Sequence, residues 1–308
     1  MENYGKKADK KEFIGESWEL SAVSDDISVV ANGFLEGNNL QEIIEVYMGD
    51  ITGEKIYEKY GDEFPLLIKL IEAREVLSVQ VHPNDSLSRE RHNAYGKTEM
   101  WYILEAEKDA VVFTGFRDSI TREDYKNALA DNKLPHLLNT EHPEKGDVFF
   151  TPAGRIHAIG AGLTLVEIQQ TSDITYRIYD WDRLGPDGKS RELHQDLAED
   201  AIDYSISRDC IIRKESIPDT TINLVRCEYF VTNILSFSNP VDKDYNFLDT
   251  FVIYICLEGE FIVKWDKGSE IVLKGETVLI PAVLTELVLE PKQEAKILEV
   301  FINTKSID

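Results

Sequence analysis

The sequence is poor in cysteine, in basic residues and in long apolar runs. Its three cysteines, Cys210, Cys227 and Cys256, form no C-x-x-C pair, which argues against a disulfide framework and a cysteine-based zinc site. Basic residues number 33 against 57 acidic ones, so the formal net charge is -24, and such a chain repels nucleic acid and anionic membranes. No stretch approaches membrane-spanning length, and the first residues hold no apolar run. We therefore expect a cytoplasmic protein that binds neither nucleic acid nor membranes.

What the chain does have is the composition of a folded protein, with 43% hydrophobic and 29% charged residues over 308 positions. That length favours two domains. Short apolar segments follow one another, separated by Gly, Pro, Asn and Asp, as strands are in a β-barrel or sandwich. These segments cover residues 66–70, 76–82, 100–104, 110–113, 148–151 and 163–169. The sequence therefore predicts a mainly β protein.

Two segments interrupt this pattern with helical signals. Thr121 can cap a helix that runs to residue 132. Residues 192–204 place apolar side chains on one helical face. We expect the first helix to lie in a short insertion near residues 117–142 and the second to link two halves of the chain.

An internal repeat supports two related halves. The segment KGDVFFTPA at residues 145–153 recurs as KGETVLIPA at residues 274–282, which indicates that one strand-entry turn occurs twice. The first copy continues to His157, whereas the second has Glu286 at the corresponding position. Two copies are too few for a solenoid, so we predict duplicated β-barrels.

The first copy resembles the second conserved motif of cupin barrels. The residues that carry this resemblance are Gly146, Pro152, Gly154 and His157, and the histidine of that motif binds metal in cupins. The resemblance implies two cupin-type (jelly-roll) β-barrels with a short helical insertion and a linking helix. We assign residues 1–190 to a metal-binding barrel, 191–221 to a helical linker and 222–308 to a barrel that has lost its metal site.

Candidate partners of His157 come from two earlier segments. Alternate residues of a strand share one face, so Gln80 and His82 of the Q-V-H-P segment point the same way. The same holds for Lys97 and Glu99 of K-T-E-M if the strand has begun at Lys97. Imidazole nitrogens with a carboxylate and an amide oxygen suit zinc or another borderline divalent ion. Three or four such ligands leave a coordination position open for a substrate.

The Q-x-H-P, K-x-E-M and G-x-x-H-A elements, in this order, resemble type I mannose-6-phosphate isomerases. The zinc ligands of that family match Gln80, His82, Glu99 and His157. The resemblance implies one zinc ion per chain, held in the N-terminal barrel. Gln80 also has a second interpretation, because a neutral amide is a poor zinc ligand and could instead orient His82.

The resemblance extends to the segment LVEIQQTSDITYR at residues 165–177, where the active-site glutamate and arginine of the family fall on Glu167 and Arg177. A basic residue of the family falls on Lys69. Eukaryotic-type members carry a large helical insertion for which this chain has no room, so it resembles the compact bacterial form.

The family resemblance implies a reaction and a small-molecule partner, a sugar phosphate. A proton moves between C1 and C2 of mannose 6-phosphate through a cis-enediol to give fructose 6-phosphate. Glu167 is the first candidate for the proton carrier and Lys97 the second. Arg177 could grip the phosphate or polarise a substrate oxygen, and Lys69 could assist either role.

Two other functions remain open at this stage. A metal-dependent cupin oxygenase would use a similar barrel, but its ligands more often include three histidines. A non-catalytic sugar-binding cupin should have lost members of the group Lys97, Glu167 and Arg177, which this chain keeps. Each of these charged residues could also be an ordinary surface group or part of an ion pair. The oligomeric state does not follow from the sequence.

Overall fold

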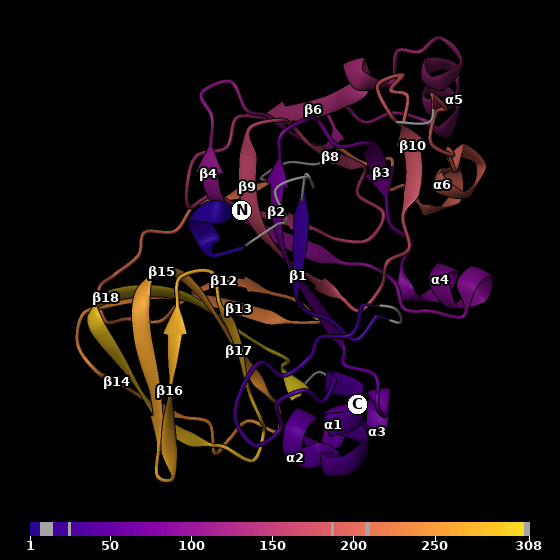
Figure 1. Cartoon of the computed structure of the whole chain (residues 1–308). Helices are drawn as coiled ribbons and strands as arrows, with labels where there is room; N and C mark the ends of the chain where they lie inside the picture. The colour runs from indigo at the N-terminus through magenta and orange to yellow at the C-terminus, as the bar shows by residue number, and fades with distance from the viewer. Residues whose placement is uncertain (7–14, 24–25, 186–187, 207–209, 305–308) are drawn as a thin grey trace. The chain divides into compact units, whose positions relative to one another are not determined.

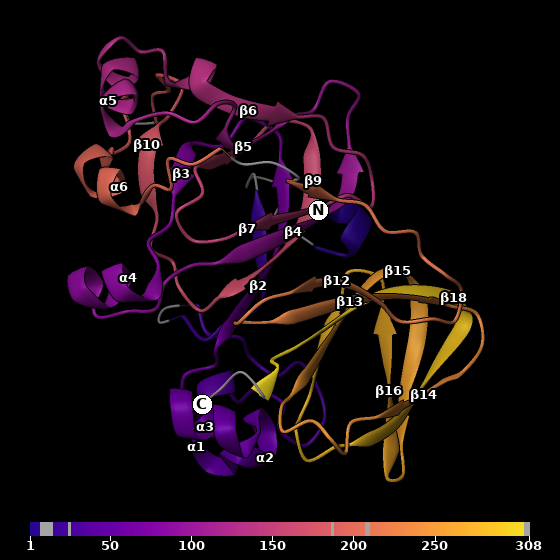
Figure 2. The ribbon, with the colours of Figure 1, turned by 180° about the vertical axis from the view of Figure 1, so that it is seen from behind.

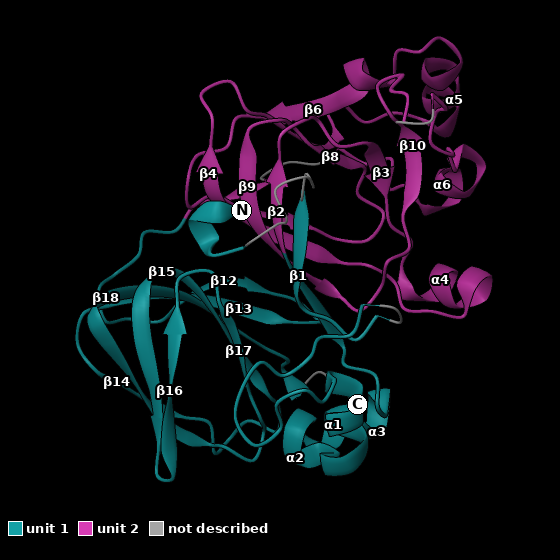
Figure 3. Cartoon of the chain, viewed as in Figure 1, with its two compact units in different colours: residues 1–69, 214–308 teal, residues 70–213 magenta. Residues whose placement is uncertain are grey.

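The computed structural model describes residues 1–6, 15–23, 26–185, 188–206 and 210–304 (Figure 1). The chain divides into two compact units (Figure 3). Residues 70–213 form the unit called here the central unit. Residues 1–69 and 214–308 form the other, called the terminal unit. No helix among the described residues combines the length and apolarity required to cross a membrane.

Two antiparallel sheets build the central unit. The strand order of the first is β1 (Glu16–Leu20), β2 (Leu66–Ala73), β9 (Leu163–Gln170), β4 (Glu99–Ala106), β7 (Val148–Thr151) and β11 (Ile211–Ile212). The order of the second is β10 (Tyr176–Tyr179), β3 (Val79–Val81), β8 (His157–Ile159), β5 (Val112–Phe116) and β6 (Leu138–Glu141). Trp101 and Leu165 of the first sheet share one apolar cluster with Val112 and Ile159 of the second. The two sheets therefore pack face to face.

Helices cover one end of the central unit, and in both views α5 and α6 lie near β10 (Figures 1 and 2). These helices are α4 (Asp85–His92), α5 (Arg122–Ala130), the 3-10 helix η2 (Leu134–Leu137) and α6 (Gln195–Ala201). Tyr125 of α5 and Ala198 of α6 are buried in the same cluster as Ile178 of β10. Thr121 caps α5 as predicted, because its side chain accepts a hydrogen bond from the Asp124 N–H and Asp124 bonds back to Thr121.

The terminal unit is built on a seven-stranded antiparallel sheet. Its path runs β12 (Ile222–Arg226), β13 (Val231–Phe237), β18 (Glu286–Phe301), β15 (Val252–Trp265) and β16 (Gly268–Leu273), while β14 (Val241–Asp244) pairs with β18 and β17 (Thr277–Ile280) with β15. Its helices are η1 (Glu2–Tyr4), α1 (Leu40–Tyr47), α2 (Gly49–Thr52) and α3 (Glu54–Tyr60).

The mainly β fold with antiparallel sheets confirms the predicted fold class, and no sheet closes on itself among the residues that the structure describes. The repeated segment makes similar turns in both copies. Gly146 and Gly275 have φ angles of 94° and 84°, a region that favours glycine, and they lie just before β7 and β17. This agrees with the predicted duplication of a strand-entry turn.

The two units differ from the predicted division into residues 1–190, 191–221 and 222–308. The early helices bond to the C-terminal sheet region: the Ala282 N–H donates to the Ile51 carbonyl at 2.9 Å, and the Glu54 N–H donates to Asp249 Oδ1 at 2.8 Å. These bonds group the first 69 residues with the C-terminal strands. The predicted linking helix is shorter than expected, and as α6 it packs on β10 within the central unit.

Candidate metal and active site

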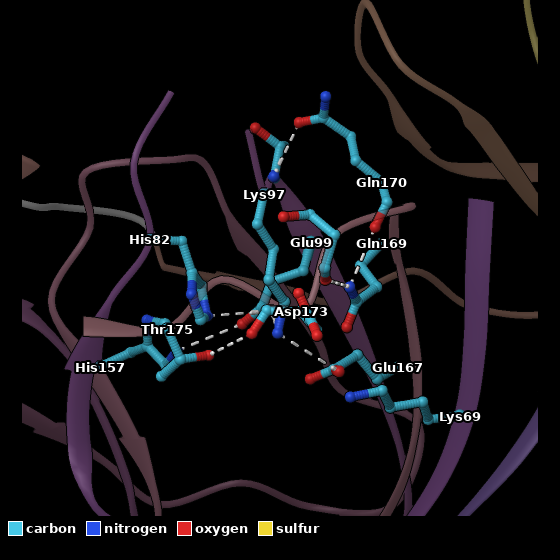
Figure 4. Close-up of polar contacts among 12 residues, drawn as sticks. Lys69, His82, Lys97, Glu99, His157, Glu167, Gln169, Gln170, Asp173 and Thr175 are labelled. Atoms are coloured by element: carbon cyan, nitrogen blue, oxygen red, sulfur yellow. Dashed lines mark hydrogen bonds and ion pairs between the residues drawn. The ribbon is translucent and has the colours of Figure 1, made fainter. Parts of the chain in front are cut away.

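Three buried side chains meet at the ends of strands in the central unit (Figure 4). His82 follows β3, Glu99 begins β4 and His157 begins β8. Their ligand atoms lie within 4.8 Å of one another. The His82 Nε2 atom is 3.5 Å from Glu99 Oε2, and the His157 Nε2 atom is 3.3 Å from Glu99 Oε1. All three side chains are at most 1% exposed, so the cluster is buried.

Backbone carbonyls fix the protonation of both histidines. The His82 Nδ1 atom lies 2.9 Å from the Ile174 carbonyl oxygen, and the His157 Nδ1 atom lies 2.9 Å from the Arg155 carbonyl oxygen. Because a carbonyl oxygen only accepts, each Nδ1 carries the hydrogen, and in the neutral ring each Nε2 turns a lone pair towards Glu99. Burial lowers the pKa of His157 to about 4. A neutral imidazole oriented in this way is the form that binds metal.

The donor set fits a divalent cation. Two imidazole lone pairs and a carboxylate converge in a buried space, and the buried His157 Nε2 atom has no hydrogen-bond partner. Converging acceptors without a cation are unfavourable in a low-dielectric interior. Two nitrogens and a carboxylate oxygen are a set of protein ligands found in catalytic zinc sites.

Gln80 lies in a row of polar residues that crosses the second sheet. Through strand pairing, Arg177 of β10 lies opposite Gln80 of β3, and Gln80 lies opposite His157 of β8, which in turn lies opposite Thr114 of β5. Directly opposed residues project to the same face of a sheet. The row therefore places Gln80 between Arg177 and His157. This position is compatible with a fourth ligand and with a group that orients a ligand. Which of the two roles it has stays a prediction.

Lys97 and Glu167 lie beside the His–Glu–His cluster (Figure 4). The Lys97 Nζ atom is 3.2 Å from Glu99 Oε2 and 3.9 Å from Glu167 Oε1. Trp101 Nε1 donates a hydrogen bond of 3.0 Å to Glu167 Oε2, so one carboxylate oxygen is held by the indole while the other faces the lysine. Lys97 and Glu167, the two candidates for the proton carrier, are 70 positions apart in the sequence. The fold brings them together.

Arg177 occupies one end of the polar row. Its Nη1 donates a 3.0 Å hydrogen bond to the Glu192 carbonyl oxygen, and its buried Nε has no hydrogen-bond partner. Burial, with a smaller contribution from the nearby Arg191, lowers the pKa of Arg177. The guanidinium nevertheless stays charged, because an arginine pKa lies far above neutrality.

Lys69 lies on β2 and is buried. Its Nζ atom is 3.7 Å from Glu16 Oε2 and 4.6 Å from the centre of the Trp18 ring. Both contacts lie within the terminal unit, and a role in substrate binding stays a prediction.

Residues that the sequence did not single out also line this region. Trp101 holds Glu167, while Gln169 of β9 and Thr151 of β7 lie directly opposite Glu99 on its two neighbouring strands. Strand alternation from Glu99 points to Trp101, and alternation from Glu167 points to Gln169. Nothing local in the sequence pairs Thr151 with Glu99, because that depends on the register between β4 and β7.

An antiparallel β fold with a buried His–Glu–His cluster, flanked by a lysine and a second glutamate, defines a cupin-type protein with a candidate metal site. Residues 3–121 match the model of a family described as phosphomannose isomerase type I, catalytic domain. The mannose-6-phosphate isomerase ManA of Bacillus subtilis is 36% identical over 279 residues, which cover 90% of this chain and 86% of that protein. A mannose-6-phosphate isomerase of Streptococcus mutans is 37% identical over 62% of this chain and 58% of its own.

Solved structures agree with these sequence relatives. The crystal structure of the mannose 6-phosphate isomerase from Bacillus subtilis superposes with a TM-score of 0.82 at 27% identity, over 97% of this chain and 93% of that one. This chain belongs to the type I mannose-6-phosphate isomerases, a family of enzymes.

Proposed function

We propose that this protein is a zinc-dependent isomerase that interconverts mannose 6-phosphate and fructose 6-phosphate through a cis-enediol. The observation that carries the proposal is the buried cluster of His82, Glu99 and His157 with Lys97 and Glu167 beside it, in a chain of this family. The cluster contains two histidines rather than the three that are more frequent in cupin oxygenases. Lys97, Glu167 and Arg177 are all present, which a non-catalytic sugar-binding cupin would not require.

His82, Glu99 and His157 would hold one zinc ion per chain, with Gln80 as the fourth ligand that the sequence predicts. Zinc, when bound, supplies a Lewis acid that polarises the carbonyl oxygen of the open-chain sugar. Burial, which lowers the pKa of His157 to about 4, favours such binding, because this imidazole has no proton to lose before the ion enters. The cytoplasmic location belongs to the same proposal.

Glu167 is the candidate that best meets the needs of proton transfer. A carboxylate that carries a proton between C1 and C2 must be buried, held in one orientation and able to return the proton. Glu167 is 4% exposed, and the Trp101 indole fixes one of its oxygens. Lys97 Nζ, 3.9 Å from the other oxygen, supplies a positive charge that favours the ionised, basic form of the carboxylate.

Arg177 is assigned to the substrate rather than to the metal. The polar row places it two strands away from His157, with Gln80 between them. A planar guanidinium can hold a phosphate or a sugar oxygen with two parallel hydrogen bonds. In a chain with net charge -24, such a local positive group offsets the repulsion of a dianionic substrate.

The proposal is tested by measuring both metal and turnover on the purified protein. We expect close to one zinc per chain, loss of mannose 6-phosphate isomerisation after chelation, and recovery when zinc is returned. Turnover should be the same with and without dioxygen, because isomerisation consumes no oxidant. A zinc-loaded protein that does not convert mannose 6-phosphate in either direction contradicts the proposed function.

Replacing Arg177 by lysine should lower isomerisation by about one to two powers of ten, since each charge-assisted hydrogen bond lost costs roughly 1.5 to 3 kcal/mol. Zinc content should not change, because the guanidinium is not a ligand. Steady-state kinetics on zinc-loaded variants check this: a raised KM alone indicates uniform binding of the phosphate, and a lowered kcat indicates a contact made in the transition state. Arg117→Lys is the matched control, since the Arg117 side chain is exposed and bonds the neighbouring Asp118. Equal kinetics for the two variants contradict the role given to Arg177.

A further inference from the structure

Buried polar atoms without a hydrogen bond gather around the His–Glu–His cluster. In the described part of the central unit, the residues outside the cluster that have such an atom are Thr114, Tyr125, Thr151, Gln169 and Arg177. All of them except Tyr125 are linked to the cluster by strand pairing. Thr114 and Arg177 lie in the polar row of His157, and Thr151 and Gln169 lie directly opposite Glu99. Groups that would be costly to bury without partners are thus concentrated where a ligand is expected.

Gln169 is the most constrained of these residues. Its side chain is 0% exposed. The amide nitrogen donates to the carbonyl oxygens of Gln170 and Ser172, at 2.9 and 2.6 Å. A flipped amide would turn its oxygen against these two carbonyls, so the hydrogen bonds fix which end is the nitrogen. The amide oxygen Oε1 therefore lies on the opposite side, and it has no hydrogen-bond partner (Figure 4).

The neighbouring Gln170 provides a contrast within the same strand. Its Oε1 accepts from the Thr98 N–H at 2.9 Å, and its Nε2 donates to Asp85 Oδ1 at 3.0 Å. Successive side chains of a strand point to opposite faces. Gln169, on the face of Glu99, therefore has an amide oxygen without a hydrogen-bond partner, whereas the amide oxygen of the adjacent Gln170 has one.

We propose that Gln169 contacts the substrate, and that its Oε1 accepts a hydrogen bond from a sugar hydroxyl outside the reacting C1–C2 pair. An amide oxygen can only accept, and Glu99 and Glu167 beside it are also acceptors when ionised, while the Lys97 ammonium contacts those two carboxylates. The partner must therefore bring its own O–H donor, as the hydroxyls on C3, C4 and C5 of an open-chain sugar phosphate do. The inference rests on the proposed isomerase function.

A thermodynamic cycle that combines an enzyme variant with a substrate analogue tests the contact itself. Wild type and Gln169→Met are assayed with mannose 6-phosphate and with its 3-deoxy, 4-deoxy and 5-deoxy forms. If one hydroxyl donates to Gln169, removing either partner should lower kcat/KM about tenfold, and removing both should lower it little further. A general weakening of the site cannot produce this non-additivity, because a structural defect lowers turnover of every analogue by the same factor.

The controls separate the remaining outcomes. Gln170→Met should be less stable but should show independent, multiplicative effects with every analogue. Multiplicative effects of Gln169→Met with all three analogues overturn the inference. A fall in the zinc content of Gln169→Met also overturns the inference, since the amide oxygen would then serve the metal or its water. If Gln169→Met does not fold, the same cycle is measured with Gln169→Asn, whose side chain is one methylene shorter. Failure of the isomerase proposal would be distinct, because wild type itself would not turn over mannose 6-phosphate.

Discussion

We expect His157→Ala to remove the metal and the isomerase activity together. The substitution deletes a proposed ligand that is 0% exposed and whose Nδ1 atom lies 2.9 Å from the Arg155 carbonyl oxygen. Changes to groups that only support a ligand already lower metal affinity about 10- to 100-fold, so loss of the ligand should exceed that range. Activity then falls to background, because the Lewis acid leaves with the ion.

Zinc content after dialysis, affinity from a competing chelator and turnover of mannose 6-phosphate measure this result. Trp101 gives an independent readout, since its ring centre lies 5.3 Å from that of His157 and its fluorescence should respond to zinc in wild type but not in the variant. His142→Ala is the matched control, because His142 is exposed and outside the cluster. A His157→Ala protein that keeps a full equivalent of tightly bound zinc excludes His157 as a ligand.

Glu167→Gln should lower kcat by about two to four powers of ten, the range typical of a lost general base, and should leave zinc bound. The amide oxygen of glutamine can still accept from the Trp101 indole, so the side chain keeps its place, but it cannot take up a proton. We expect KM to change little, since the substituted group acts on C1 and C2 during the reaction rather than on the phosphate.

The isotope readout identifies the proton carrier. In deuterated water, wild type should incorporate solvent deuterium into the sugar during turnover, and Glu167→Gln should lose this exchange in proportion to kcat. Lys97→Met is the comparison variant, because Lys97 contacts both Glu99 and Glu167 and is the second candidate. Exchange and turnover near wild type in Glu167→Gln, together with their loss in Lys97→Met, would transfer the role to the lysine. Glu105→Gln, an exposed position on the same strand as Trp101, controls for a general loss of negative charge.

Several features of the site were predictable because they depend on short stretches of chain. Alternation along a strand predicted that Lys97 and Glu99 lie together; the two side chains are in contact, although β4 begins only at Glu99 and Lys97 lies just before it. Helix capping located α5, because Thr121 and Asp124 are three residues apart. The repeat at residues 145–153 and 274–282 indicated the turn that both copies make at a glycine with positive φ.

The division of the chain into two units was harder to predict from local sequence patterns. The early helices α1 to α3 carry no sequence signal that assigns them to the C-terminal strands. Their grouping depends on contacts such as those of Ile51 with Ala282 and of Glu54 with Asp249. The partners in each contact are about two hundred residues apart, and no local period connects them.

The sequence alone determined which chemical groups are present and in what local spacing: two imidazoles, two carboxylates, a lysine and an arginine on segments that alternate as strands do. Only the tertiary structure decided which of them face one another. The registers that set Gln80 opposite His157 and Gln169 opposite Glu99 join residues about 70 positions apart. The carbonyl that fixes the tautomer of His82 belongs to the distant Ile174. Strand periodicity is a property of a few consecutive residues, whereas register is set by packing across the whole sheet, and for that reason the open acceptor of Gln169 became visible only in the folded chain.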